Sequence, residues 1–166
     1  MKAYHFLKND MRGGYGNEPP WEVGEEREHK GKLVMCQSGY HAGKSWYDAL
    51  SYAKGEMACI VELSGTITKD TTKYVAQKRK LISAVNAKKV LRTWGCDCAE
   101  RALKKAKVTD ERSWNAIKIA RLHNEGEATS KELAAAWDAA WAAEIKWQKR
   151  HLNKLMKQLF EESELK

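Results

Sequence analysis

The residues best suited to chemistry in this sequence are basic side chains with aromatic neighbours. Residues 69–108 hold twelve Lys or Arg against three Asp or Glu, while the 166-residue chain has a formal net charge of +8. Lys and Arg neutralise phosphates, and a neighbouring ring can stack on a base. This pattern predicts a bound nucleotide or nucleic acid, with a solvated basic face as the alternative. The predicted ligand-binding residues are Tyr40, His41, Tyr52, Lys73, Lys78, Arg79, Lys80, Lys88, Lys89 and Arg92.

A second group of residues has the layout of an enzyme. The sequence GYHA at residues 39–42 precedes a short predicted helix, and Glu62 follows on a predicted strand. This layout is similar to the middle of an ADP-ribosyltransferase fold, which implies that His5, Tyr40 and His41 grip a nicotinamide dinucleotide. Glu62 would hold a ribose hydroxyl and stabilise an oxocarbenium-like state. His41 could instead be a turn histidine, and Glu62 could be a solvent-facing carboxylate. The transferase is therefore an alternative to the main functional prediction.

Four cysteines offer a possible metal site. Cys36 and His41 are five residues apart, and Cys96 and Cys98 add two more thiols, but this is not the spacing of a zinc finger or ribbon. Cys98 also fits the apolar face of a predicted helix, which is the commoner place for a lone cysteine. We therefore expect reduced thiols, no metal and no cofactor.

Several motifs resemble a known domain family. They are CQSGYHA at residues 36–42, DALSYA at 48–53 and VELSG at 61–65, and the resemblance continues through KYVAQKR at 73–79 into the Ala- and Trp-rich tail. The chain resembles a domain family of unknown function that is common in tailed-phage and prophage genomes. It departs from that family at Gly43, where Cys is frequent, and at Asn86, where Asp is frequent.

This resemblance implies a phage or prophage origin and a location in the cytoplasm of the host bacterium, but it brings no activity. Phage accessory proteins often act against host defence. We therefore expect an accessory protein that is not an enzyme and acts in counter-defence. Its partner would be an anionic ligand, either a nucleotide signal or a nucleic acid, or a host defence protein.

Hydrophobic patterning indicates which elements position these residues. Strands are predicted at 2–7, 32–36, 57–63 and 73–82, with a long loop over 9–31. The strand at 57–63 is apolar on both faces and should be central in its sheet. The run from Lys78 to Lys80 must place a basic side chain on each face of its strand, so one face is wet or meets an anion. Ser45 and Asp48 form a capping box that starts a short helix.

The second half of the chain has helical periodicity. Helices are predicted from Asn86, from Asp110 and from Thr129, the last with a capping box to Glu132 and a length of about thirty residues. The predicted fold class is α+β: a small, mainly antiparallel N-terminal sheet with one short helix, then a helical C-terminal half ending in a long helix. The predicted parts are residues 1–84, 85–127 and 128–166.

The long helix is also a candidate association surface, and a structural or assembly protein that acts through this helix is a further alternative function. Its length exceeds the width of a small domain, so we expect a homo-oligomer formed through an apolar seam. The predicted interface residues are Trp137, Trp141, Ile145, Leu152, Leu155 and Leu159. No run of about 18 apolar residues exists, which argues against a membrane-spanning helix, and the first residues do not form a signal peptide.

Overall fold

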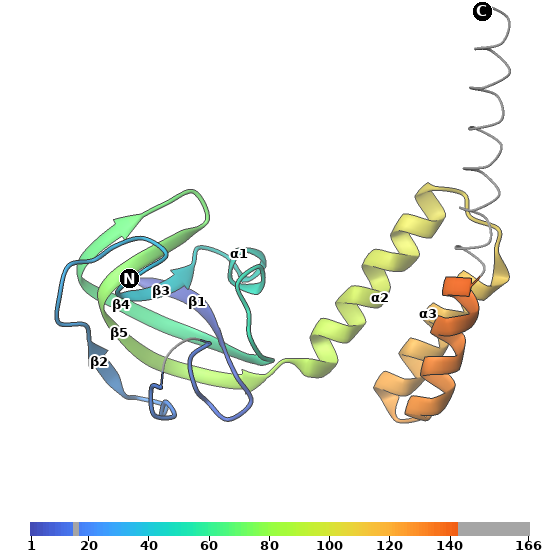
Figure 1. Ribbon diagram of the computed structural model, residues 1–166, viewed down its shortest axis with the longest axis horizontal. Helices are drawn as coiled ribbons and strands as arrows, with labels where there is room; N and C mark the ends of the chain where they lie inside the picture. The colour runs from blue at the N-terminus through green and yellow to red at the C-terminus, as the bar shows by residue number, and fades with distance from the viewer. Residues whose placement is uncertain (15–16, 143–166) are drawn as a thin grey trace, which may run out of the picture. The chain divides into compact units, whose positions relative to one another are not determined.

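The fold is α+β, as predicted, with an antiparallel sheet and one short helix followed by helices (Figure 1). The computed structural model describes residues 1–14 and 17–142. The chain divides into two compact units, Met1–Leu91 and a second that begins at Arg92. Each unit is described by itself.

The first unit is built on a sheet that closes on itself. Strands β1 (Lys2–Leu7), β3 (Tyr40–Gly43), β4 (Met57–Lys69) and β5 (Lys73–Asn86) pair in a cycle, each with its neighbours antiparallel. The short β2 (Glu26–Glu28) adds to the edge of β5 beyond β3. Because β4 pairs with both β1 and β5, the predicted central position of residues 57–63 is confirmed.

The β4–β5 hairpin is longer than predicted and irregular. Its register shifts between Ile60 and Val61 and again between Ser64 and Ile67. Such bulges bend a strand and increase its twist, which lets one long hairpin contribute to both sides of a closed sheet. Alternate side chains then point inward and form the core, to which a loop contributes Trp21. The buried core cluster is Ala3, Leu7, Trp21, Ala42, Cys59, Val61, Leu63, Ala76 and Leu81.

The short helix α1 (Trp46–Leu50) begins at the predicted capping box of Ser45 and Asp48. Trp46 packs against Tyr4 and Phe6, with ring centroids 4.6 and 5.8 Å apart. A Cβ atom at Gly43 would lie 2.5 Å from the backbone nitrogen of Ala49. Gly43 therefore allows α1 to lie directly against β3.

Two local predictions in the first unit are wrong. Residues 32–36 do not form a strand, because Val34 makes only one bridge, to Ser38, and this bridge closes a turn. The chain reverses too soon for these residues to reach a neighbouring strand. Within the predicted loop at 9–31, β2 forms by pairing with the middle of β5.

The second unit is helical. Helix α2 (Lys88–Lys105) starts in the first unit and continues into the second, and α3 (Glu111–Glu125) runs from its N-cap Asp110 to Gly126. A salt bridge joins the two helices, because Arg121 Nη2 lies 2.8 Å from a carboxylate oxygen of Asp97. Residues 130–142 are helical after the predicted Thr129–Glu132 capping box. Among the described residues, no helix combines the length and apolar character needed to cross a membrane.

Candidate ligand-binding pocket

The first unit contains a pocket of about 750 Å³ on the inner side of the closed sheet. This volume is in the range of small-molecule sites. Its wall combines residues from β1, β3, β5, α1 and the connecting loops. Five of the predicted ligand-binding residues line it together: Tyr40, His41, Tyr52, Lys73 and Arg79. His5, predicted only for the transferase, lines it as well.

Arg79 provides a buried positive charge on the pocket wall. Only 4% of the residue is exposed, because β5 turns Arg79 inward between two outward-facing lysines. Its Nη1 donates a hydrogen bond to the His41 carbonyl oxygen at 3.2 Å, and its guanidinium lies 4.9 Å from the Tyr40 ring centre. Burial lowers the pKa of Arg79 to about 10. Glu18 also lines the pocket, and its negative charge raises the pKa of Arg79 against the effect of burial. No carboxylate among the described residues lies within ion-pair distance of this guanidinium, so its charge is compensated only in part.

His5 adds a polar atom that lacks a partner. Its Nε2 is buried, and within residues 1–14 and 17–142 nothing hydrogen-bonds to it. Burial, and then the charges of Arg79 and His41, hold the pKa of His5 well below the usual 6.5. The ring is therefore neutral near pH 7. Buried polar atoms are normally hydrogen-bonded, so this one marks a position where a ligand can bind.

His41, in contrast, is fully engaged by the backbone. Its Nε2 accepts a hydrogen bond from the Cys36 N–H at 2.9 Å, which places the ring proton on Nδ1, 3.0 Å from the Gly39 carbonyl oxygen. Burial lowers the pKa of His41 too. The turn that carries Cys36 at φ 66° is held by this ring. His41 therefore shapes the pocket, and its nitrogens are already occupied.

Lys73 supplies a second cation to the pocket wall, and only 9% of this residue is exposed. Its Nζ lies 4.1 Å from the ring centre of Tyr52, and a hydrogen bond with the Cys36 side chain raises the pKa of Lys73. Cys36 and Tyr52 are exposed, whereas Arg79 and the His5 Nε2 are buried. The pocket therefore runs from a solvent-facing rim to a buried polar end.

Trp21 is a pocket-supporting residue that sequence reasoning missed. It is 2% exposed, and its ring lies between the guanidinium groups of Arg27 at 4.1 Å and Arg79 at 4.4 Å. Its Nε1 donates to Glu18 Oε2 at 3.1 Å, and its backbone N–H donates to the Met11 carbonyl. A lone tryptophan after two prolines in an otherwise polar loop was the available sequence signal.

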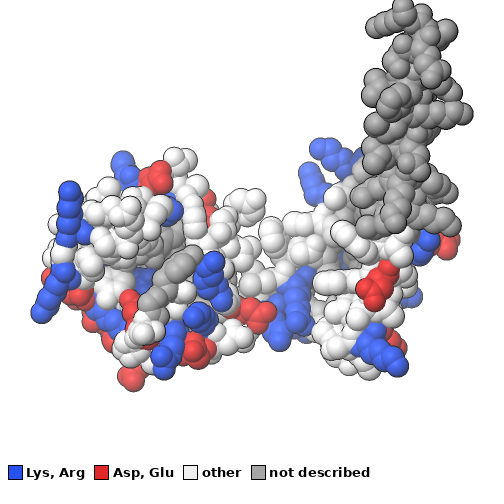
Figure 2. Space-filling model, viewed as in Figure 1, with Lys and Arg blue, Asp and Glu red and all other residues white. Residues whose placement is uncertain are grey.

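The other predicted basic residues do not line this pocket. Lys78 and Lys80 flank Arg79 on the opposite face of β5, in register with Glu28 and Glu26 of β2, and Lys78 Nζ lies 3.5 Å from Glu28 Oε2. Figure 2 shows basic and acidic side chains interspersed on the first unit. The remaining three, Lys88, Lys89 and Arg92, are exposed on α2.

Glu62 lies away from the rings that the transferase hypothesis assigns to it. It is on the face of β4 opposite Val61 and Leu63, and its side chain is 57% exposed. Its Oε1 lies 4.0 Å from the amino group of Met1. Glu62 is not part of the pocket wall that holds His5 and Tyr40. The structure therefore does not assemble the constellation of His5, Tyr40, His41 and Glu62.

The four cysteines are free thiols. Cys36 belongs to the first unit with His41, while Cys96 and Cys98 belong to the second. Over the described part of the chain, no three His, Cys, Asp or Glu side chains group so as to hold a metal ion.

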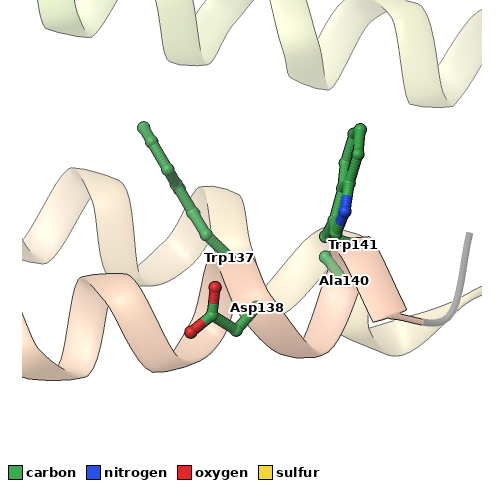
Figure 3. A pocket seen from close by; sticks show the side chains of 4 residues that line it. All are labelled: Trp137, Asp138, Ala140 and Trp141. Atoms are coloured by element: carbon green, nitrogen blue, oxygen red, sulfur yellow. The ribbon is translucent and has the colours of Figure 1, made fainter. Parts of the chain in front are cut away.

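Two of the predicted association residues lie on the helix at 130–142. Trp137 and Trp141 extend from the same side of this helix and, with Asp138 and Ala140, line a shallow pocket of about 440 Å³ (Figure 3). They are 60% and 68% exposed. The other predicted interface residues lie outside the described part of the chain; they are Ile145, Leu152, Leu155 and Leu159.

Comparison with known proteins gives one match. A family model described as Domain of unknown function (DUF7666) matches residues 1–93. This match covers the closed sheet, the pocket and the first turn of α2. No curated protein and no solved structure matches the chain significantly.

Proposed function

We propose that this chain, which belongs to the DUF7666 family of domains of unknown function, binds a small anionic ligand of the nucleotide class in the pocket. The observation that carries the proposal is Arg79, a nearly fully buried cation on the pocket wall without a carboxylate partner among the described residues. A buried charge is costly unless it is paired. An anionic ligand supplies the missing partner, and a charge-assisted hydrogen bond to arginine is strong.

The rest of the wall fits a nucleotide. Lys73 is a second buried cation on the wall, and Tyr52 offers an exposed ring on which a base can stack. The pocket volume fits one small molecule rather than a polymer. These features favour a free nucleotide over the nucleic acid that the basic residues also predict.

Electrostatics on the outer face support the same choice. Lys78 and Lys80, on either side of Arg79, lie opposite the glutamates of β2. Nucleic-acid binding relies on clustered, solvent-facing Lys and Arg that contact phosphates. Interleaved acids weaken such a surface, so the buried arginine carries more of the proposal than the exposed lysines.

A biological role follows from the resemblance stated above. We propose a phage-encoded accessory protein that sequesters a nucleotide signal in the bacterial cytoplasm and so acts in counter-defence. Sequestration needs binding and no turnover, in keeping with a non-enzymatic role. A host defence protein becomes the proposed partner if no nucleotide binds in the pocket.

The first experiment is native mass spectrometry of the protein purified from bacterial cells at low salt, followed by calorimetric titration with AMP, ADP, ATP and the guanine equivalents. We expect a nucleotide adduct or a measurable affinity in the parent protein, lost in Arg79→Met. Lys80→Ala is the matched control, because Lys80 is on the same strand and outside the pocket wall. No binding by any of these nucleotides, or equal loss in both variants, would contradict the proposal.

A second candidate function is self-association, which is favoured by the two exposed tryptophans of the helix at 130–142. Large exposed rings are typical of interface anchors. The partner proposed for this surface is a second copy of the chain. This function is compatible with ligand binding, because the two features belong to different units.

A further inference from the structure

We infer that the pocket selects a ligand with a terminal phosphate, bound at its buried end by Arg79 and His5, over a phosphodiester. This inference rests on the proposed function and specifies the ligand further. It is carried by two buried polar groups on the wall of one pocket. Among the described residues, the His5 Nε2 has no hydrogen-bond partner, and the Arg79 guanidinium donates only to the His41 carbonyl oxygen.

Arg79 provides a fork of donors. Guanidinium has five N–H groups in one plane, and among the described residues only the His41 carbonyl oxygen accepts from it. The rings of Trp21 and Tyr40 pack beside it and exclude water. The remaining donors match the two oxygens of a phosphate or carboxylate in bidentate geometry.

His5 provides a donor of a different kind. Because its ring is neutral, it adds a hydrogen bond and no second charge to the buried end. In the tautomer with a proton on Nε2, this atom donates to an oxygen anion beside Arg79. His5 and Arg79 both line the pocket. One arginine fork and one imidazole N–H thus offer three donors to one ligand group.

Three donors match a terminal phosphate better than a diester. A terminal phosphate has three acceptor oxygens, so the fork takes two and His5 takes the third. A diester has only two free oxygens, and its second ester bond must continue past a guanidinium that is 4% exposed. The depth of the site therefore requires the phosphate to be the end of the ligand, with the base towards Tyr52 at the rim.

The test compares matched ligands that differ only in this group. Calorimetric titration of the full chain with AMP and with 3′,5′-cyclic AMP, and with the guanine pair, measures the selectivity directly. We expect the 5′-monophosphate to bind at least about tenfold more tightly. The cyclic form lacks the third phosphate oxygen, so it loses one charged hydrogen bond and leaves the His5 Nε2 unpaired. Equal affinities, or tighter binding of the cyclic form, overturn this inference and leave the proposed function standing. Failure of all four ligands to bind overturns this inference, and the proposed function falls with it only if ADP, ATP and their guanine equivalents also fail to bind.

Variants of His5 provide the second readout. In His5→Phe, we expect AMP affinity to fall about tenfold more than affinity for cyclic AMP, so the selectivity disappears. Unchanged selectivity in a folded His5→Phe protein contradicts the assignment. Histidine ¹⁵N NMR of the parent protein covers the case in which this variant does not fold. Addition of AMP should shift the His5 Nε2 resonance and leave that of His123 in α3 in place, and an unmoved His5 resonance overturns the inference.

Discussion

The guanidinium of Arg79 lies 4.4 Å from the ring centre of Trp21, and Arg27 lies 4.1 Å from that same ring. One indole thus contacts an arginine of β5 and an arginine of β2. Cation–π contacts of this kind are strengthened when they are desolvated, and Trp21 is 2% exposed. The loop that carries Trp21 is thereby fixed against Arg79, so the pocket depends on a contact between residues far apart in the sequence.

Replacing Trp21 should therefore destabilise the first unit. For Trp21→Ala we expect a loss of about 3–5 kcal/mol in the free energy of unfolding, because a large buried ring leaves a cavity. The Nε1 donor to Glu18 and both arginine contacts disappear as well. Urea denaturation followed by circular dichroism measures the change. Trp21→Phe keeps a ring and should lose clearly less, so an equal loss in both variants would argue against the stacking.

Arg79→Met should separate stability from binding. The lowered pKa of Arg79, about 10, means that burial disfavours the charged form in the folded state. Folding at pH 7 therefore pays a desolvation cost that methionine, with a similar length and no charge, removes. For Arg79→Met at pH 7, we expect a urea midpoint of unfolding equal to or above that of the parent protein, together with loss of nucleotide binding. A clear drop in the midpoint would mean that the arginine is retained for stability.

Much of this fold follows from local sequence signals. The capping box at Ser45 and Asp48 is present, and the alternation of residues 57–63 correctly indicated a central strand. The predicted strand at 32–36 is absent, because Val34 bridges to Ser38 and the chain turns there. Strand β2 was missed, because a strand three residues long forms through its partner and has no periodicity of its own. The closure of the sheet was also beyond it, since closure depends on bulges near Ile60 and Ser64.

The site shows the same division. The run from Lys78 to Lys80 had to place a base on each face of its strand, and Arg79 is the one that points inward. The sequence therefore predicted a base on each face of this strand. Which base points inward, its burial and the missing carboxylate are properties of the three-dimensional arrangement. Glu62 illustrates the converse, because a carboxylate at a suggestive spacing points to the other face of β4.

Stability should fall as the pH is lowered through the range of His5. The unfolded ring takes up a proton near pH 6.5, whereas burial keeps the folded ring neutral to well below that pH. The free energy of unfolding is therefore unaffected by this ring above pH 6.5. Below pH 6.5 it falls by up to about 1.4 kcal/mol per pH unit for each such group. His41, whose pKa is also lowered, acts in the same direction.

The measurement is the urea midpoint at pH 7.5, 6.5 and 5.5 for the parent protein and for His5→Phe. The variant has one titrating ring fewer, so its midpoint should fall less steeply between pH 6.5 and 5.5. His41 still accounts for part of the slope in both proteins. An identical slope in the variant would show that His5 is protonated in the folded state.

Alkylation of the cysteines should map the pocket. Cys36 is exposed on the pocket wall and Cys98 is exposed on α2, whereas Cys59 is buried, and burial raises its pKa to about 11. With iodoacetamide at pH 7.5 we expect the native protein to be labelled at Cys36 and Cys98 and not at Cys59, because the thiolate is the nucleophile. A bound nucleotide should slow labelling of Cys36 and leave Cys98 unchanged. Peptide mass spectrometry measures both rates, and equal rates with and without nucleotide would place the ligand elsewhere.

Removal of the exposed indoles should weaken self-association. Trp137 and Trp141 are one helical turn apart on the same side of their helix, and the small Ala140 beside them permits close approach of a partner helix (Figure 3). Because each ring has more than half of its surface exposed, pairing with a second copy removes a large apolar area from water. We expect the double variant Trp137→Gln, Trp141→Gln to shift the protein to monomer in size-exclusion chromatography with light scattering. Val85→Gln, which removes an exposed apolar side chain from β5, is the matched control and should leave the mass unchanged. A parent protein that is already monomeric, or a double variant that keeps the parent's mass, would assign these indoles a role other than self-association.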